Sequence, residues 1–273
     1  MISMKYKKFY YPEVHTYPDG TFKVNMPEIP VIDNQPIEVV WTYRKEQDLT
    51  LLIYITENLK ENYKNPVHLY MPYVPNARMD RVHDKNEVFT LKYFCKIINF
   101  LEFDSVKVLD VHSPVTSALI DRCENISPMK YINTTIKLSG INPKYDYIFF
   151  PDEGSFKRYS DMFVNFDNIG FGIKKRDWKT GKITGLDISG DSPTNKNVLL
   201  IDDICSYGGT AYHSAKKLKT AGCRNVHLYF THCENSIFQG ELLREDLINH
   251  IYTTNSASDI MQSGKITVFD CVV

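Results

Sequence analysis

Residues 198–210 constrain the fold of this chain more than any other segment. The four apolar residues 198–201 predict a buried strand, and two adjacent carboxylates, Asp202 and Asp203, follow them directly. A short loop with two glycines then leads to Thr210, where a helical pattern opens. A strand that turns within a few residues into a helix is typical of α/β folds with parallel sheets.

The loop before this helix is suited to bind an anion. Gly208 and Gly209 let the backbone approach a ligand closely and take positive φ. The first amides of a helix are a ready phosphate site, and the hydroxyl of Thr210 can cap the helix or bind a phosphate oxygen. Asp202 and Asp203 instead suit hydroxyl donors or a metal ion, so a sugar phosphate satisfies both demands. The simpler alternative is a strand–turn–helix with solvated corner carboxylates.

Short β-type runs alternate with helical periods along the whole chain, which favours an α/β fold with mostly parallel sheets. Helices are predicted at 49–59, 88–98 and 210–221, and Gly222 ends the last of them. The predicted strands are 38–42, 67–71, 106–109, 147–150, 169–173, 198–201, 226–230, 251–254 and 266–269.

Two domains are expected from the length and from one break in the pattern. At roughly 150 residues per domain, a chain of 273 residues suggests about two domains or one large domain. The stretch 125–143, rich in Asn, Ser, Pro and Gly, separates two strand–helix series. We place the boundary near 135, which divides the chain into domains 1–135 and 136–273.

Charge and cysteine content exclude several classes of protein. The formal net charge is −1, so the chain lacks the basic excess of a general nucleic-acid binder. The six cysteines form no Cys-x-x-Cys pair, which indicates reduced thiols in a cytoplasmic compartment. No apolar run approaches the roughly 20 residues of a membrane span, and the N-terminus does not look like a signal peptide. We therefore expect a cytoplasmic protein with no nucleic-acid or membrane partner.

The segment around Asp202 and Asp203 resembles the phosphoribosyl-diphosphate binding motif of the type I phosphoribosyltransferase superfamily. That motif is a hydrophobic strand, two acidic residues and a small-residue loop ending in Gly-Thr. Other segments resemble the ribose-phosphate pyrophosphokinase (PRPP synthetase) branch, in the family's order and over nearly the whole chain. These segments are 16–20, 71–81, 109–113, 150–154 with the following Lys157 and Arg158, 172–176, 231–232 and 254–255.

The resemblance implies two phosphoribosyltransferase-like domains and a diphosphotransferase reaction. The β,γ-diphosphate of Mg-ATP would pass to the anomeric 1-hydroxyl of ribose 5-phosphate, with release of AMP. Cations aimed at developing charge would stabilise the transition state. The implied residues are Tyr17, Asp19, Arg78 and Met79 for ATP; Asp202, Asp203, Ser206, Tyr207, Gly208, Gly209 and Thr210 for the sugar phosphate; His112 and Asp152 for Mg²⁺; and Lys174 and Arg176 for catalysis.

Each of these assignments has a simpler explanation. His112 could be a structural histidine, and Arg78 beside Asp80 could form an exposed ion pair of little energetic weight. Residues 174–176 could be a solvated run of charge, and we take Lys157 and Arg158 for surface residues. Because no histidine neighbours Cys205 in sequence, we interpret that thiol as a small apolar filler rather than a nucleophile.

Several departures from the family pattern bear on the substrates. Ser206 and Tyr207 replace an Asp-Thr pair, whose Thr binds the 5-phosphate in the family. Near the ATP, Met79 replaces a polar Gln and Asn76 replaces an aromatic residue. Thr21 replaces a Glu that would contact the adenine. The introduced ring is consistent with a larger 5′ substituent, as in ADP-ribose. Some phage members of the family are thought to convert ADP-ribose to its 1-diphosphate during NAD⁺ rebuilding. Ribose 5-phosphate and ADP-ribose both remain open as acceptors.

Two other functions remain open. A phosphoribosyltransferase that uses PRPP would share 202–210 but would not need the segments at 16–20, 71–81 and 109–113. A non-catalytic regulatory subunit of the same fold is the other, although Lys174 is retained with the other implied catalytic and metal residues. The family assembles from dimers in which a neighbour completes the ATP site, so we expect a homodimer or a higher homo-oligomer. Its location would be the host cytoplasm if a phage encodes it.

Overall fold

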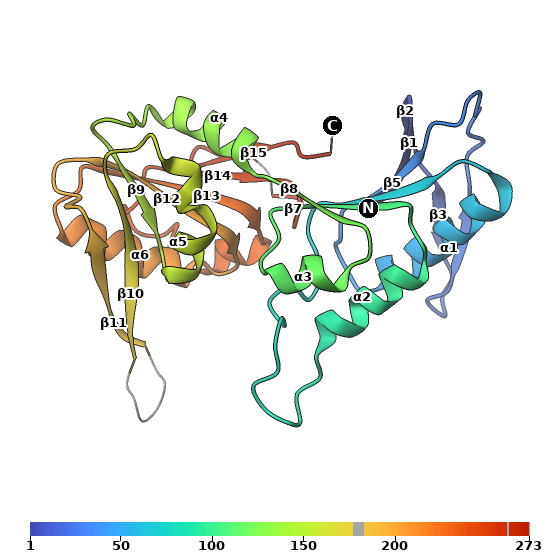
Figure 1. The fold of residues 1–273 in the computed structure, drawn as a ribbon, viewed down its shortest axis with the longest axis horizontal. Coiled ribbons are helices and arrows are strands. Elements are labelled where there is room, and N and C mark those ends of the chain that lie inside the picture. The colour runs from blue at the N-terminus through green and yellow to red at the C-terminus, as the bar shows by residue number, and fades with distance from the viewer. Residues whose placement is uncertain (177–182, 261, 273) are drawn as a thin grey trace. The chain divides into compact units, whose positions relative to one another are not determined.

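The predicted strands form two sheets, one in each of two units of the chain (Figure 1). The computed structural model describes residues 1–176, 183–260 and 262–272. Unit 1 is formed by Met1–Ser127 and unit 2 by Pro128–Cys271. Each unit holds a mostly parallel sheet flanked by helices, which confirms the predicted α/β class.

Six strands form the sheet of unit 1, in the order β2-β1-β5-β6-β7-β8. The four strands from β5 to β8 are parallel, and a helix connects each to the next, as parallel pairing requires. β1 is antiparallel to both of its neighbours. The strands are β1 (Ile2–Tyr6), β2 (Lys8–Tyr10), β5 (Ile37–Trp41), β6 (Val67–Met71), β7 (Ser105–Leu109) and β8 (Cys123–Ile126).

The helices of unit 1 are α1 (Gln47–Asn62), α2 (Thr90–Phe100) and α3 (Pro114–Leu119). The first two confirm the predictions at 49–59 and 88–98. They form because their apolar residues recur every three or four positions, and those residues are buried against the sheet. A separate hairpin of β3 (Glu13–Thr16) and β4 (Phe22–Asn25) belongs to the same unit.

Seven strands form the sheet of unit 2, in the order β11-β10-β9-β12-β13-β14-β15. All neighbours from β10 to β15 are parallel, and only β11 is antiparallel to its partner β10 among the described residues. The strands are β9 (Tyr147–Phe150), β10 (Ile169–Arg176), β11 (Ile183–Gly190), β12 (Asn197–Cys205), β13 (Asn225–Cys233), β14 (His250–Thr254) and β15 (Ile266–Phe269).

Both faces of the unit 2 sheet are covered, because its central strand is apolar on both sides. Val198 and Leu200 of β12 join one core cluster with α6 (Gly209–Thr220), whereas Leu199 and Ile201 join a second cluster. The second cluster includes residues of α4 (Met129–Ser139) and α5 (Glu153–Tyr159). Two 3₁₀ turns, Ser160–Phe163 and Asn235–Gln239, complete the described elements of this unit.

The two units divide at Ser127/Pro128, whereas the sequence places the boundary near 135. Residue 135 lies inside α4, which contacts β13 and β14 of unit 2. Ile132 and Thr135 are fully buried on its inner face. The stretch at 125–143 therefore contains an amphipathic helix, whose polar outer face gives it the composition of a linker.

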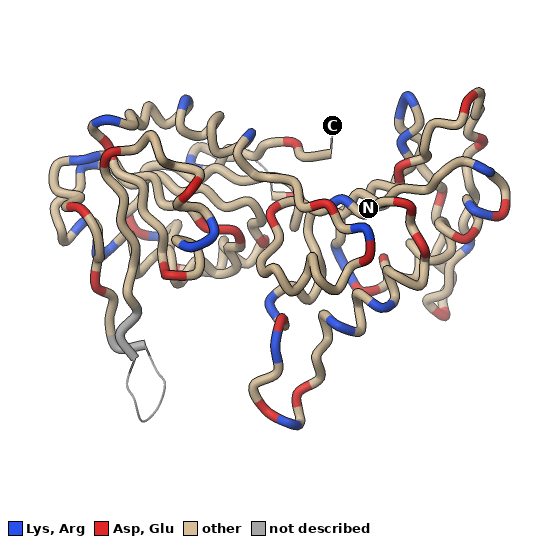
Figure 2. The backbone as a smooth tube through the Cα atoms, viewed as in Figure 1, with Lys and Arg blue, Asp and Glu red and all other residues tan. Residues whose placement is uncertain are grey.

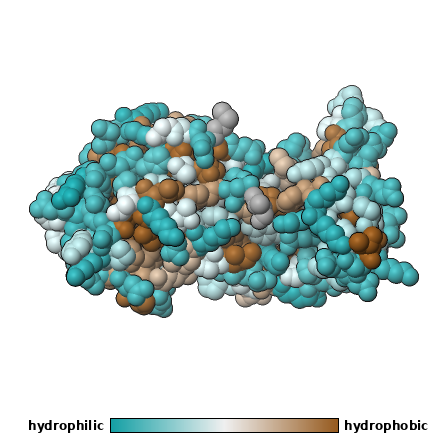
Figure 3. Space-filling view, turned by 90° about the horizontal axis from the view of Figure 1, so that it is seen from above, coloured by the Kyte–Doolittle hydropathy of each residue, from teal (hydrophilic) through white to brown (hydrophobic). Residues whose placement is uncertain are grey.

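The surface of both units mixes charges of both signs. Basic and acidic residues are interspersed along the backbone (Figure 2), in keeping with the net charge of −1. On the face seen in Figure 3, hydrophobic groups lie scattered among hydrophilic ones. Among the helices that the structure describes, none has the length and apolar character needed to cross a bilayer.

A pair of histidines in unit 2 predicts a loss of stability at mildly acidic pH. His227 of β13 and His250 of β14 are register partners, and burial lowers the pKa of both imidazoles; the proximity of His250 lowers that of His227 further. The charges of Asp146 and Lys219 also act on His227, in opposite directions. Because the unfolded chain takes up protons first, the free energy of unfolding should fall as pH drops from 7.5 through 6.5.

Urea denaturation of the wild type at pH 7.5 and about pH 5.5, a range that brackets the ordinary histidine pKa, measures this loss. The double variant H227Q/H250Q should lose less stability over the same interval, because it carries two fewer groups that titrate there. Equal losses in the two proteins would assign the effect to other groups.

Candidate active site

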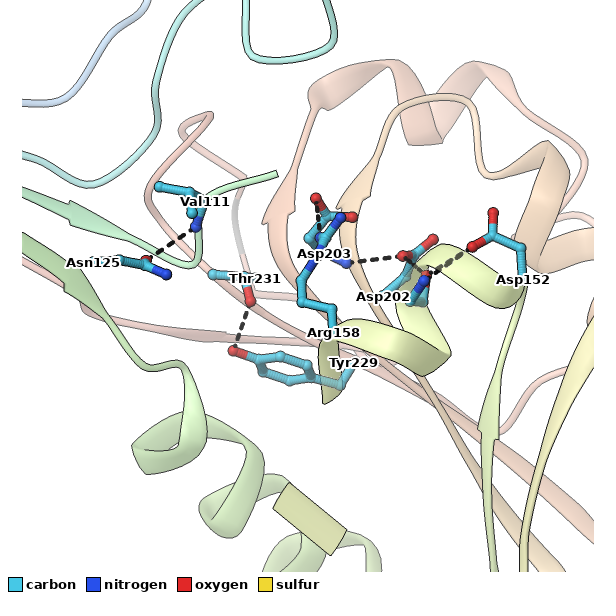
Figure 4. Close-up of polar contacts among 9 residues, drawn as sticks. Val111, Asn125, Asp152, Arg158, Asp202, Asp203, Tyr229 and Thr231 are labelled. Carbon is cyan, nitrogen blue, oxygen red and sulfur yellow. Dashed lines mark hydrogen bonds and ion pairs between the residues drawn. The ribbon is translucent and has the colours of Figure 1, made fainter. Parts of the chain in front are cut away.

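Asp202 and Asp203 lie near the carboxyl end of β12, and helix α5 holds both of them (Figure 4). The hydroxyl of Ser155 donates a hydrogen bond of 2.6 Å to Oδ1 of Asp202. The guanidinium of Arg158 forms an ion pair with the Asp203 carboxylate, with 2.5 Å between nitrogen and oxygen. The side chain of Asp203 is 5% exposed and that of Arg158 24%. The interpretation of Arg158 as a surface residue is therefore wrong.

Asp152 starts the helix that provides these contacts. It is the N-cap of α5, and its Oδ1 accepts a hydrogen bond of 3.0 Å from the backbone N–H of Ser155. Asp152, Ser155 and Arg158 recur every three residues, which places them near one another on one side of the helix. This spacing was a signal in the sequence for Ser155 and Arg158, which sequence reasoning missed.

The carboxylates in this part of unit 2 repel one another. Burial raises the pKa of Asp202, the charges of Asp203 and Asp152 raise it further, and the hydrogen bond from Ser155 opposes them in part. The pKa of Asp202 therefore stays well above its ordinary value. A site with such excess negative charge favours a bound cation or hydrogen-bond donors from a ligand.

The thiol of Cys205 is structural, as the sequence suggested. It is 3% exposed, and Cys205 is the register partner of Cys233 on β13. A hydrogen bond with Cys233, together with burial and nearby negative charge, raises the pKa of the Cys205 thiol well above its ordinary value. A protonated, buried thiol is a poor nucleophile. All six cysteines are described, and none forms a disulfide.

The predicted loop follows β12 and leads into α6, which begins at Gly209. Gly208 has φ of 77° and is the N-cap of the helix, so only glycine fits there without strain. The sequence allowed Thr210 to act as the cap, but it lies within the helix with its side chain exposed. The first amides of α6 have no acceptor in a preceding turn, as the predicted phosphate site requires.

Tyr207 lies in this loop and is 59% exposed. A neighbouring segment packs on the backbone of the loop: a Cβ atom at Gly240 would come within 1.9 Å of the Tyr207 carbonyl oxygen, and Leu242 contacts Gly208. Glu234 donates its backbone N–H to the Cys205 carbonyl at 2.8 Å. The loop backbone is therefore supported on one side, while the ring of Tyr207 stays accessible.

Two of the predicted ATP residues lie in the turn of the β3–β4 hairpin in unit 1. Tyr17 accepts a backbone hydrogen bond from Gly20, and Oδ1 of Asp19 accepts hydrogen bonds from the N–H and hydroxyl of Thr21 at 2.9 and 2.7 Å. These bonds lower the pKa of Asp19, beginning with the bond from the Thr21 hydroxyl. Thr21, which departs from the family pattern, therefore orders the turn. Both Tyr17 and Asp19 are exposed.

The other unit 1 residues lie in the loops after β6 and β7. Asp80 forms its ion pair with Arg81, at 3.0 Å. Burial acts to raise the pKa of Asp80, but hydrogen bonds from Arg81 and Ser113 and the charge of His112 outweigh it, so the pKa is lowered. His112 thus lies near Asp80, a residue that the sequence did not assign to the site. Arg78 is exposed, and Met79 is partly buried.

The structure thus groups the predicted residues by unit. Asp152, Asp202, Asp203 and the loop of Tyr207 belong to unit 2, whereas His112 belongs to unit 1 with the predicted ATP residues. Within the part of the chain that is described, no cluster of three or more His, Cys, Asp or Glu side chains is arranged to hold a metal.

The predicted catalytic residues lie on a long hairpin of unit 2. The backbones of Lys174 and Arg176 belong to β10 and pair with Leu186 and Ile183 of β11. The side chains of Lys174 and Arg176 lie outside the described residues, as do residues 177–182, which follow β10 in the chain.

No protein-family model matches the chain. Individual proteins and one solved structure are nevertheless similar to most of it. The ribose-phosphate pyrophosphokinase of Pyrococcus furiosus is 28% identical over 229 residues, which cover 81% of this chain and 77% of that protein. That of Sulfurisphaera tokodaii is 26% identical over 266 residues, 94% of this chain and 88% of that protein. The phosphoribosylpyrophosphate synthetase structure from Mycobacterium smegmatis has the same fold, with a TM-score of 0.77 at 17% identity over 96% of this chain and 87% of that one.

Proposed function

Because this chain belongs to the ribose-phosphate pyrophosphokinase family, whose members are diphosphotransferases, we propose that it transfers the β,γ-diphosphate of ATP to a sugar. The acceptor atom is the anomeric 1-hydroxyl of a ribose 5-phosphate moiety, and AMP is released. The observation that carries the proposal is the end of β12, where Asp202 and Asp203 precede a helix N-terminus capped by Gly208.

Different residues of unit 2 bind the phosphate and the ribose ring of the acceptor. Backbone amides at the start of α6 bind its 5-phosphate, aided by Ser206 and the hydroxyl of Thr210. The carboxylates of Asp202 and Asp203 accept hydrogen bonds from the ribose hydroxyls, which fixes the sugar ring. Arg158 holds Asp203 in place through their ion pair. These contacts position the 1-hydroxyl for attack, which is the main contribution of a protein to this type of transfer.

The nucleotide is assigned to the residues that the family resemblance implies. Tyr17 and Asp19 contact the adenine, and Arg78 and Met79 lie along the triphosphate. Lys174 and Arg176 donate to the transferring diphosphate as its charge develops.

The carboxylates of unit 2 fit Mg²⁺ as the cofactor. The raised pKa of Asp202, caused by burial and by its acidic neighbours, marks an excess of negative charge that a cation would offset. Magnesium takes one or two protein carboxylates and completes its shell with water and substrate phosphates, so a large cluster of protein ligands is not required. Asp152 is the proposed ligand in unit 2, and the family resemblance implies His112 as a further Mg²⁺ ligand. When bound, Mg²⁺ neutralises phosphate oxygens of the nucleotide.

The test of the reaction is a product assay with two acceptors. The protein is incubated with Mg-ATP and either ribose 5-phosphate or ADP-ribose, and mass spectrometry identifies both the nucleotide and the sugar product. We expect AMP together with PRPP or ADP-ribose 1-diphosphate. Consumption of PRPP and a base without ATP would instead indicate a phosphoribosyltransferase, and no turnover with any substrate would favour a regulatory subunit.

The exposed ring of Tyr207 favours ADP-ribose as an acceptor, since an adenine base could stack on it. Replacing Tyr207 with alanine should then raise KM for ADP-ribose about tenfold, the usual worth of one base stacked on an aromatic ring. KM for ribose 5-phosphate should change less than about twofold, because surface substitutions away from a ligand have small effects. Steady-state kinetics with each acceptor measure the difference.

Tyr145 provides the matched control, because it is also an exposed aromatic residue of unit 2, at 64%, and it lies before β9 rather than beside the loop of Tyr207. Y145A should leave both KM values near those of the wild type. Equal effects of Y207A on the two acceptors would contradict a role of the ring in recognising a 5′ extension.

The assembly and location follow from the same proposal. We propose a homodimer or a higher homo-oligomer as the active form, and a location in the cytoplasm, where the six reduced cysteines would be stable. Light scattering after size-exclusion chromatography tests the first point.

A further inference from the structure

Ser155 contacts two carboxylates of the proposed site through two different donors. Its backbone N–H donates to Oδ1 of Asp152 at 3.0 Å, and its hydroxyl donates to Oδ1 of Asp202 at 2.6 Å. Asp152 precedes α5, whereas Asp202 lies on β12. Ser155 itself is 3% exposed. One buried residue therefore joins the proposed cation ligand to the proposed sugar ligand.

The hydroxyl of Ser155 has one proton and two carboxylates within reach. Its oxygen is 2.6 Å from Asp202 but 3.3 Å from Asp152, so the proton is donated to Asp202. The backbone N–H of Asp203 also donates to Oδ1 of Asp202, at 3.1 Å. Two donors on one oxygen fix the rotation of the Asp202 carboxylate and direct its second oxygen away from them (Figure 4).

We propose that Ser155 is a positioning residue, whose hydroxyl orients the Asp202 carboxylate toward the hydroxyls of the acceptor sugar. Its backbone N–H holds Asp152 independently of the side chain. The inference rests on the proposed function, since it takes Asp202 as a ligand of the sugar. A change of the Ser155 side chain then acts on the sugar alone and leaves the nucleotide side of the site intact.

Two variants of Ser155 test this split. S155A removes the hydroxyl, and S155C keeps the size of the side chain but is a weak donor. Both keep the backbone bond to Asp152, so the helix cap is preserved. In calorimetry, the Kd of ribose 5-phosphate or ADP-ribose should rise roughly tenfold in both, the cost of one hydrogen bond to a charged group. The Kd of Mg²⁺ with the α,β-methylene analogue of ATP should change less than about twofold, because its contacts remain.

Ser214 offers the matched control, because it is also buried in unit 2, and its hydroxyl has no hydrogen-bond partner in the described structure. S214A should leave both Kd values unchanged. The melting temperatures of all variants are measured beside the binding, since a merely structural role of Ser155 would lower the melting temperature and weaken both ligands alike.

The outcomes separate this inference from the proposed function. A wild type that produces AMP while S155A or S155C binds the sugar normally overturns the role of Ser155 and leaves the reaction standing. Equal weakening of sugar and nucleotide likewise overturns it. A wild type that binds neither sugar and releases no AMP overturns the proposed function and the role of Ser155 with it.

Discussion

Replacing Asp202 with asparagine is expected to abolish most activity and, at the same time, to stabilise the protein. Asparagine keeps an oxygen that can accept the bonds from Ser155 and Asp203, so the local structure should persist. The charge that the sugar hydroxyls and the cation would meet is lost. We expect kcat/KM to fall at least about a hundredfold, as when one strong polar contact to the transition state is removed.

The gain in stability follows from the raised pKa of Asp202, which burial and the neighbouring carboxylates cause. A carboxyl whose pKa is higher in the folded state contributes fully to stability only below its unfolded pKa, about 4. That contribution is lost as pH rises through the folded pKa, so at higher pH the charged group destabilises the fold. Asparagine carries no charge, and a gain of ~1 kcal/mol would raise the melting temperature by about 3 °C.

Differential scanning calorimetry at neutral pH, beside the product assay, measures both effects. D246N is the control, since the side chain of Asp246 is 97% exposed and pairs with Lys265 at the surface, at 3.2 Å. D246N should leave activity and melting temperature nearly unchanged. A destabilised D202N protein would contradict the view that the carboxylates of unit 2 repel one another.

Replacing Lys174 with alanine is expected to remove turnover while folding and ATP binding remain largely intact. Lys174 lies on β10 within the hairpin with β11, where its backbone pairs with Leu186. A cation that meets charge only as it develops contributes to kcat rather than to ground-state binding. Loss of such a donor should lower kcat about a hundredfold to a thousandfold.

Pre-steady-state and steady-state kinetics, with nucleotide affinity from calorimetry, check this expectation. K265A provides a lysine of the same unit whose exposed pair with Asp246 lies outside the proposed site. It should turn over like the wild type. Unchanged turnover in K174A would remove Lys174 from the catalytic role, whereas lost ATP affinity would make it a binding residue.

The strands that the sequence predicted best are those buried on both faces. Val198 to Ile201 form an unbroken apolar run, because the two clusters of unit 2 cover both sides of β12. β1 and β2 were missed, since Lys5 and Lys8 interrupt their apolar pattern. These lysines lie over the rings of Phe9 and Tyr10. A charge that packs on an aromatic face cannot be distinguished, in sequence, from one in a solvated loop.

Helix α4 was missed for a related reason. It carries Asn133, Thr134 and other polar residues on its outer face, and this composition resembles that of a linker. Its inner face carries Ile132 and Thr135, which are buried where α4 contacts β13 and β14 of the same unit. Only the neighbouring sheet makes so few buried positions sufficient for a stable helix, since short helices depend on tertiary packing for their stability.

The sequence by itself determined which side chains meet at the end of β12, in the candidate site of unit 2. Asp202, Asp203 and the glycine loop are adjacent in the chain, and adjacency places them at one strand end whatever the rest of the fold does. The tertiary structure alone decided that Arg158 contacts Asp203 and that Ser155 contacts Asp202. These contacts form because α5 packs against the end of β12. Ser155 and Asp202 are 47 residues apart in the chain. Residue types and local spacing specify what a segment can bind, but only packing between distant elements specifies which side chains hold it in place.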